Sequence, residues 1–294
     1  PEEAFPAGMC VVGAALRRAG HDVVLFDFLR CAGDYESLGR AVRESCAELF
    51  GISIRNIDNV DYLAPEFYLD DVKEIIARIR RCSKSPVFLG GSGFSLMPEE
   101  ILEYTGGDYG IAGAGEASAV MLADALASGK TPDRKIIHSE QGAFSFGGLD
   151  YDRDLLSWYL SFNNVIPVHT KRGCPKKCVY CSYPRLEGCG VRMRPDGELM
   201  GDLEFFACEY PGRIIYFTDS VFNDDRKLFL GLLDSVVRRG LKIRWRAFFT
   251  PQIFSDDEMM LIKRSGVETP VLGIDALTDT TLDGLGKGYD FDTA

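Results

Sequence analysis

Three cysteines lie within eight residues of one another in this chain. Cys174 is separated from Cys178 by three residues and Cys178 from Cys181 by two, and the aromatic Tyr180 directly precedes the last cysteine. Thiolates with these spacings can bind three corners of a 4Fe-4S cubane from one compact loop, whereas complete ligation would need a fourth cysteine. The segment therefore predicts an iron-sulfur cluster whose fourth iron is open to a small-molecule ligand.

A zinc site is the alternative for the same cysteines. His169, or Cys189 beyond the loop, could complete a tetrahedron of three cysteines and one histidine, or of four cysteines. Zinc sites more often show paired C-x-x-C segments, and His169 falls within a predicted strand. The cluster is the favoured interpretation, and zinc in place of iron would overturn it.

The composition restricts the class of protein. The 294 residues are 46% hydrophobic and carry a formal net charge of -11, which suffices for a buried core and disfavours a surface that collects phosphate backbones. No stretch approaches the roughly 18 uncharged apolar residues of a membrane span, and no signal-peptide pattern begins the chain. We therefore expect a cytoplasmic protein with no membrane span and no nucleic-acid partner.

Elements alternate between helix and strand in the first part of the chain. Repeated strand and helix predicts an α/β fold with a doubly wound parallel sheet, here of Rossmann-like type. The predicted helices are 9–18, 34–48, 66–81, one from 98, and 116–127, and the predicted strands are 23–28, 49–54, 87–89 and 109–112.

A glycine-rich stretch over residues 129–163 interrupts this alternation and predicts a linker that could contain a short hairpin, with one helix around 154–160. The expected domains are therefore 1–128, which lacks a first strand, and 164–294. The second domain again alternates, with strands 165–170, 214–218, 243–249 and 270–274 and helices 198–209, 226–239 and 256–265. Four strands predict a partial β/α barrel, and the chain is interpreted as a fragment of a longer protein.

The cysteine loop follows the first strand of the second domain, where barrel enzymes carry their chemistry. A C-x-x-x-C-x-aromatic-C loop in this place resembles the radical S-adenosylmethionine (radical SAM) superfamily, over about residues 164–294. The resemblance implies that S-adenosylmethionine chelates the open iron and is cleaved to a 5′-deoxyadenosyl radical. It also implies that Thr218-Asp219-Ser220 holds the methionine amino group, that Asp275 meets the ribose, and that Tyr180 contributes to the nucleotide site. Lys287, in a Lys-Gly pair typical of relatives, is assigned a structural role.

Alternative roles for these residues stay open. Asp219 or Ser220 could instead cap a helix, and Asp275 could occupy a solvated turn. No side chain is assigned as catalytic, because the cofactors would carry the chemistry.

The first domain is similar to the cobalamin-binding domain that precedes many radical enzymes, over about residues 1–128. That resemblance implies a small residue after one strand and glycines after the next, where the nucleotide tail would approach the backbone. No Asp-x-His-x-x-Gly motif is present, so cobalt would have no histidine ligand, and Arg55 or Asn56 is the candidate for its lower face. A surface Arg55 paired with Asp58 or Asp61 is the alternative. The candidate cobalamin-binding residues are Ser53, Arg55, Asn56, Gly90, Gly91, Ser92, Gly93, Gly113 and Gly115.

The expected function is a cobalamin-dependent radical SAM methyltransferase acting on an unactivated carbon. A radical isomerase or cyclase with a non-methylating or vestigial cobalamin domain, and a non-catalytic zinc or iron-sulfur module, are the alternatives. The expected partners are a small-molecule, lipid or peptide substrate and an external electron donor of flavodoxin or ferredoxin type.

Overall fold

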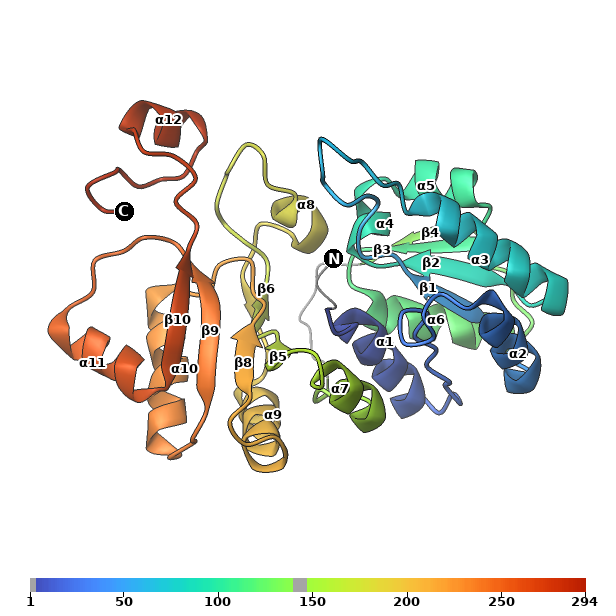
Figure 1. Cartoon of the computed structure of the whole chain (residues 1–294), viewed down its shortest axis with the longest axis horizontal. Helices are drawn as coiled ribbons and strands as arrows, with labels where there is room; N and C mark the ends of the chain where they lie inside the picture. The colour runs from blue at the N-terminus through green and yellow to red at the C-terminus, as the bar shows by residue number, and fades with distance from the viewer. Residues whose placement is uncertain (1–3, 140–146) are drawn as a thin grey trace. The chain divides into compact units, whose positions relative to one another are not determined.

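The computed structural model describes residues 4–139 and 147–294 and divides the chain into two compact units (Figure 1). Unit 1 contains residues 6–139 of the described chain, and unit 2 contains residues 147–294 together with residues 4 and 5. No helix among the described residues is long and apolar enough to cross a membrane.

Unit 1 is built on a parallel sheet with the strand order β1-β2-β3-β4. Its strands are β1 (Phe50–Ser53), β2 (Val87–Gly90), β3 (Tyr109–Ala112) and β4 (Ile136–His138), and its helices are α1 (Ala7–Arg18), α2 (Tyr35–Ser45), α3 (Leu69–Cys82), α4 (Ser92–Leu96), α5 (Pro98–Thr105) and α6 (Gly115–Ala127).

Two hydrophobic clusters hold the sheet of unit 1. One joins apolar side chains of α2, α3 and α5 to β2, and the other joins those of α1 and α6 to β3. The helices therefore cover both faces (Figure 1), and the predicted doubly wound α/β arrangement is confirmed.

Two details of unit 1 differ from expectation. Residues 23–28 belong to no strand and form no ladder among the described residues, so the predicted strand there is wrong. Its apolar character comes instead from Phe26 and Phe28, which pack against the core beside α2 and α3. The expected linker also contains β4, which pairs with β3. The sequence did not predict this strand, because a short strand framed by polar residues gives little periodic signal.

Unit 2 contains a second parallel sheet, with the strand order β10-β9-β8-β5. The strands are β5 (Val165–Val168), β8 (Ile214–Phe217), β9 (Arg244–Phe249) and β10 (Val267–Leu272), and a small antiparallel pair is formed by β6 (Lys171–Arg172) and β7 (Arg192–Met193). The helices are α7 (Arg153–Tyr159), α8 (Tyr183–Glu187), α9 (Asp196–Glu209), α10 (Arg226–Arg238), α11 (Asp256–Arg264) and α12 (Asp279–Gly284).

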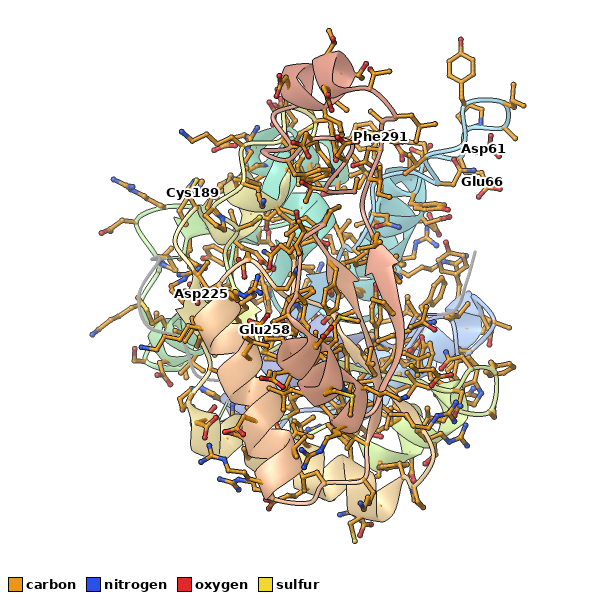
Figure 2. All side chains as sticks on the ribbon, turned by 90° about the vertical axis from the view of Figure 1, so that its left-hand side faces the viewer. Asp61, Glu66, Cys189, Asp225, Glu258 and Phe291 are labelled. Carbon is orange, nitrogen blue, oxygen red and sulfur yellow. The ribbon has the colours of Figure 1, made fainter. Side chains whose placement is uncertain are left out.

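Aromatic side chains fill the core of unit 2. Trp245 on β9 is fully buried and packs against Phe217 and Phe222, whose rings stack with centroids 4.7 Å apart. A Ser255–Glu258 capping box begins α11, and Arg226 of α10 binds the same Glu258. Figure 2 labels Glu258 and Asp225, the residue that caps α10. These contacts fix the successive strand-helix units, and the four-strand β/α arrangement matches the prediction.

Candidate cofactor sites

The cysteine loop begins at the carboxyl end of the sheet of unit 2. It follows β5 and β6 and runs into α8, at the edge where parallel strands present their loops (Figure 1). Cys174 is buried, and Cys178 and Cys181 are half-buried. All three are free thiols, so the loop presents three available thiolate donors. Cys189 is exposed and lies beyond α8 (Figure 2).

The backbone holds this loop in a closed shape. Cys174 donates its N–H to the carbonyl of Gly188 at 3.1 Å, and Cys181 donates to Cys178 at 3.1 Å. Gly173 has a φ of 90°, and a Cβ there would lie 2.0 Å from the carbonyl oxygen of Gly190. Only glycine permits this backbone and this approach, so the loop turns back upon itself just before its first cysteine.

The loop supplies the donor type that an iron-sulfur cluster takes. Among the described residues, no three His, Cys, Asp or Glu side chains converge closely enough to hold one metal ion. A cubane is larger than one ion and takes thiolates at separate corners. Three cysteines on a single loop therefore suit the predicted group.

Asp219 follows β8, but its carboxylate is already bound. It accepts the N–H of Thr170 at 2.8 Å, the Thr170 hydroxyl at 2.5 Å and the N–H of Lys171 at 3.2 Å. Burial raises the pKa of Asp219, and the hydrogen bonds from Thr170 and the charge of Lys171 oppose that shift. The side chain joins the end of β8 to the segment that leads into the cysteine loop.

The residues on either side of Asp219, Thr218 and Ser220, carry hydroxyls that lack such partners within the described part of the chain. Thr218 Oγ1 and Ser220 Oγ are buried and make no hydrogen bond with any described residue. Buried hydroxyls are nearly always paired in folded proteins. Two unpaired ones at a strand end, next to the loop that carries the cysteines, fit a polar ligand at the position predicted for the methionine end of S-adenosylmethionine.

A buried ion pair lies at the base of the loop and was not foreseen from the sequence. The Lys171 ammonium pairs with Asp224 and donates to the carbonyl of Phe222 at 3.3 Å. Burial lowers the pKa of Lys171, an effect that Asp219 and Cys174 oppose. Lys171 lies in the two-residue strand β6 and Asp224 in the turn before α10, so no periodic pattern marks them.

Asp275 is also engaged within the protein. Its Oδ2 accepts the Tyr180 hydroxyl at 2.6 Å and the Lys287 ammonium. The hydrogen bond from Lys287 and then that from Tyr180 lower the pKa of Asp275. Burial alone would lower the pKa of Lys287, but the bonds to Asp275 and Tyr180 outweigh it and raise that pKa. The structure thus joins three residues that the sequence interpretation treated separately.

The glycine loop after β2 in unit 1 lies against the backbone that follows β1. Gly91 has a φ of 99°, and a Cβ there would lie 2.4 Å from the carbonyl oxygen of Ile54. A Cβ on Gly93 would lie 3.1 Å from the carbonyl oxygen of Arg55, and Ser92 Oγ donates to that oxygen at 2.9 Å. These glycines are therefore needed for contact between two strand-end loops, a reason that the sequence interpretation did not include.

Two further glycines of the predicted site have separate local roles. Gly113, with a φ of 93°, donates its N–H to Ser95 Oγ at 2.9 Å, which ties the end of β3 to α4. A Cβ on Gly115 would lie 3.0 Å from Val12 of α1. Gly113 therefore belongs to the strand-end surface, whereas Gly115 serves the contact between α1 and α6.

Ser53, Arg55 and Asn56 are exposed at the end of β1. Among the described residues Arg55 makes no ion pair, because Asp58 and Asp61 accept backbone N–H groups of their own loop instead. The surface pairing considered for Arg55 does not form. Its guanidinium is therefore available at the strand end where the ligand-binding crevice of a doubly wound sheet lies.

The segment from Asp58 to Phe67 projects from unit 1 as a structured loop (Figure 2). Asn59 closes it: its side chain donates to the carbonyl of Ala64 at 2.8 Å and accepts from Asp61 and Glu66 at 3.1 and 3.0 Å. The apolar residues at its tip are exposed, namely Val60, Tyr62 and Leu63.

Comparisons with known proteins agree with this division. The family model for the B12 binding domain matches residues 1–123, and that for the Radical SAM superfamily matches residues 168–294. Among curated proteins, the chain is 25% identical to tryptophan 2-C-methyltransferase of Streptomyces laurentii over 97% of its own length and 61% of the relative's. It is 26% identical to hopanoid C-3 methylase of Methylococcus capsulatus over 92% of its length and 53% of the relative's.

A solved structure shows the same fold. The radical S-adenosylmethionine methyltransferase TsrM from Kitasatospora setae, with cobalamin and a 4Fe-4S cluster bound, superposes with a TM-score of 0.87 and 24% identity over 99% of this chain and 63% of that one. The chain thus spans less than two thirds of the length of these relatives. Its two matched regions, its fold and its cysteine loop place the chain in the family of radical SAM proteins that carry a B12-binding domain.

Proposed function

We propose that this chain forms the cofactor-binding part of a cobalamin-dependent radical SAM methyltransferase that acts on an unactivated carbon of a small-molecule substrate. The observation that carries the proposal is the pairing, at one strand edge of unit 2, of three free cysteines on a closed loop with two buried, unpartnered hydroxyls. The B12-binding match over unit 1 supports the methyl-transfer reading.

The residues of unit 2 have distinct roles in this proposal. Cys174, Cys178 and Cys181 would hold the cluster, and the hydroxyls of Thr218 and Ser220 would accept hydrogen bonds from the amino group of S-adenosylmethionine. When bound, the cluster supplies the electron that cleaves the sulfonium, and cobalamin supplies the methyl group.

Asp219 and Lys171 act beneath that site. Asp219 fixes the backbone before the loop through its bonds to Thr170 and Lys171. The buried Lys171 ammonium places a positive charge near Cys174.

The strand-end surface of unit 1 would hold cobalamin without a histidine ligand. Arg55 is the candidate for the lower face of cobalt, where a cation disfavours a further ligand, with Ser53 and Asn56 beside it. Gly90 and Gly113 leave the neighbouring strand ends without side chains. We further propose an electron donor of flavodoxin or ferredoxin type and a cytoplasmic location, which would keep the nine cysteines reduced.

The first test is anaerobic reconstitution with iron, sulfide and hydroxocobalamin, followed by absorption spectra and metal analysis. We expect about four irons per chain and a broad band near ~400 nm, both lost in a Cys174→Ala/Cys178→Ala/Cys181→Ala variant and kept in Cys189→Ala. Zinc in place of iron, or iron retained by the triple variant, would refute the cluster assignment.

Cobalt analysis of the same samples tests unit 1. We expect cobalamin to co-elute with the chain and the Arg55→Ala variant to change the spectrum of bound cob(II)alamin, while Arg40→Ala on α2 leaves it unchanged. Iron without cobalt would retain the radical SAM assignment and exclude methyl transfer through unit 1.

A further inference from the structure

Tyr180, Asp275 and Lys287 form a network in which Lys287 comes from beyond α12 and Tyr180 from the cysteine loop, far from the other two in sequence. Lys287 is buried, with a side chain only 8% exposed. Its ammonium donates to the Tyr180 hydroxyl at 2.9 Å and binds Asp275 Oδ2, the same atom that accepts from Tyr180. Three polar groups from three segments therefore converge on one another.

Two aromatic rings complete the surroundings of this ammonium. It lies 5.5 Å from the centroid of the Tyr180 ring and 6.0 Å from that of Tyr289. The Tyr289 hydroxyl donates to the carbonyls of Gly273 and Ile274 at 2.8 and 3.1 Å, which anchors the chain after Lys287 to the end of β10. A buried ammonium that has a carboxylate, a hydroxyl and two ring faces around it is fixed in position.

The backbone beside Lys287 contacts the cysteine loop directly. Val179 donates its N–H to the carbonyl of Leu285 at 3.1 Å. Gly286 has a φ of 68°, and a Cβ there would lie 2.7 Å from the carbonyl oxygen of Lys177. The segment 285–287 thus touches the stretch 177–180, which carries the second cysteine and leads to the third.

Asp275 has an unfavourable backbone conformation. It is a non-glycine residue with a φ of 64°, a backbone conformation that costs a side-chain-bearing residue free energy. The bonds to Tyr180 and Lys287 offset that cost and aim the carboxylate at the loop.

We infer that Lys287 is a positioning residue for the cluster loop: through Tyr180 and Asp275 it holds the segment 178–181 against the end of β10, and so sets where Cys178 and Cys181 present their thiolates. This role goes beyond the structural one expected for the Lys-Gly pair. It also gives Asp275 a task that does not involve a ribose.

The first arm of the test uses the chain without metal, so it does not depend on the proposed function. Alkylation of individual cysteines is followed by mass spectrometry in the wild type, Lys287→Met, Lys287→Arg and Tyr180→Phe. We expect Cys178 and Cys181 to react about tenfold faster in Lys287→Met, because the loss of charge-assisted hydrogen bonds frees the loop. Tyr180→Phe should show a smaller increase and Lys287→Arg should recover most of the protection.

Internal references separate this effect from general unfolding. Cys189 and Cys208 are exposed and lie in the same unit, so their rates should not change. Lys263→Met, at an exposed position of α11, is the matched control and should react like the wild type. Equal acceleration at all cysteines in Lys287→Met would mean that this residue serves only overall stability.

The second arm, which rests on the proposed function, measures the reduced cluster after anaerobic reconstitution. We expect Lys287→Met to bind iron at the wild-type ratio but to show an altered electron paramagnetic resonance signal and a weaker spectral response to S-adenosylmethionine, with Lys287→Arg close to the wild type. Unchanged alkylation of Cys178 and Cys181 overturns the positioning role whatever the cluster does. Failure of the wild type to take up iron, with the alkylation difference present, refutes the proposed function and leaves the positioning role intact.

Discussion

Replacing Asp219 by alanine removes a buried carboxylate on which the backbone before the cysteine loop depends. The side chain accepts from Thr170 N, Thr170 Oγ1 and Lys171 N, and it lies near the buried Lys171 ammonium. In the alanine variant these donors lose their acceptor inside the protein, where water does not replace it.

The size of the effect follows from these contacts. A hydrogen bond to a charged group contributes about 1.5–3 kcal/mol, and Asp219 accepts three bonds. Because the bonds share one acceptor and are not additive, we expect Asp219→Ala to lower the free energy of unfolding of unit 2 by about 4 kcal/mol. Asp219→Asn keeps the volume and one acceptor oxygen, and should cost about half as much.

The positions of the tryptophans make this measurable in the intact chain. Both tryptophans, Trp158 and Trp245, lie in unit 2, and Trp245 is fully buried. Tryptophan fluorescence during urea unfolding therefore reports on unit 2. With a denaturant dependence of about 2–3 kcal/mol per molar urea, the expected loss lowers the midpoint by about 1.3–2 M. Asp257→Ala, an exposed substitution on α11, should stay within about 0.5 kcal/mol of the wild type.

A midpoint shift below about 0.3 M in Asp219→Ala would refute this reasoning, since it would mean that the donors of Thr170 and Lys171 find other acceptors at little cost. An equal loss in the asparagine and alanine variants would instead show that the negative charge, and not the set of hydrogen bonds, carries the stabilisation.

Three further outcomes are expected. Gly91→Ala should lower the hydrogen-exchange protection of residues 50–54 by at least about tenfold, because a Cβ would collide with backbone at a φ of 99°. Gly90→Ala is the control: its Cβ would make an ordinary 3.7 Å contact, so the protection should change little. The pKa of Glu258 is lowered to about 2, mainly by the hydrogen bond from Arg226. The ionised carboxylate therefore stabilises the folded state fully above the unfolded pKa of about 4.3, and this stabilisation disappears as the pH falls to 2. The melting temperatures of the wild type and Glu258→Gln should differ at pH 6 and converge near pH 2. Thr218→Val and Ser220→Ala should leave the urea midpoint unchanged or raised, since each removes an unpartnered buried hydroxyl. Each should also weaken S-adenosylmethionine binding to the reconstituted chain about tenfold in equilibrium dialysis. An unchanged affinity would contradict the proposed role of these hydroxyls in binding S-adenosylmethionine.

The elements that the sequence predicted well are those whose side chains alternate strongly between core and solvent. Strands such as β2, β8 and β9 and long helices such as α3 and α10 fall within a few residues of their predicted bounds. The segment 23–28 was predicted as a strand because it is apolar, yet a strand also needs a neighbour for its backbone. A hydrophobic pattern indicates which residues are buried, but it does not indicate whether a segment pairs with a neighbouring strand.

The candidate site was predicted in its donors and not in its internal contacts. Spacing alone identified Cys174, Cys178 and Cys181, because covalent chemistry demands a residue type at a fixed interval. That Asp219 faces backbone amides, and that Lys287 reaches Tyr180, depends on how segments far apart in sequence are folded together. No local pattern encodes such contacts, so these residues could be placed near the site but not given their partners.

The projecting loop of unit 1 divides into a fixed base and a self-contained tip. At the base, Gly91 and Gly93 lie so close to the backbone of 54–56 that a change of length there would displace the strand-end surface. Beyond Asn59 the turn is closed by its own hydrogen bonds, and the exposed residues 60–63 contribute nothing to the hydrophobic core. The sequence of the tip can therefore be replaced as a unit. Such a replacement would change which molecules the loop contacts, while the surface proposed to hold cobalamin keeps its shape.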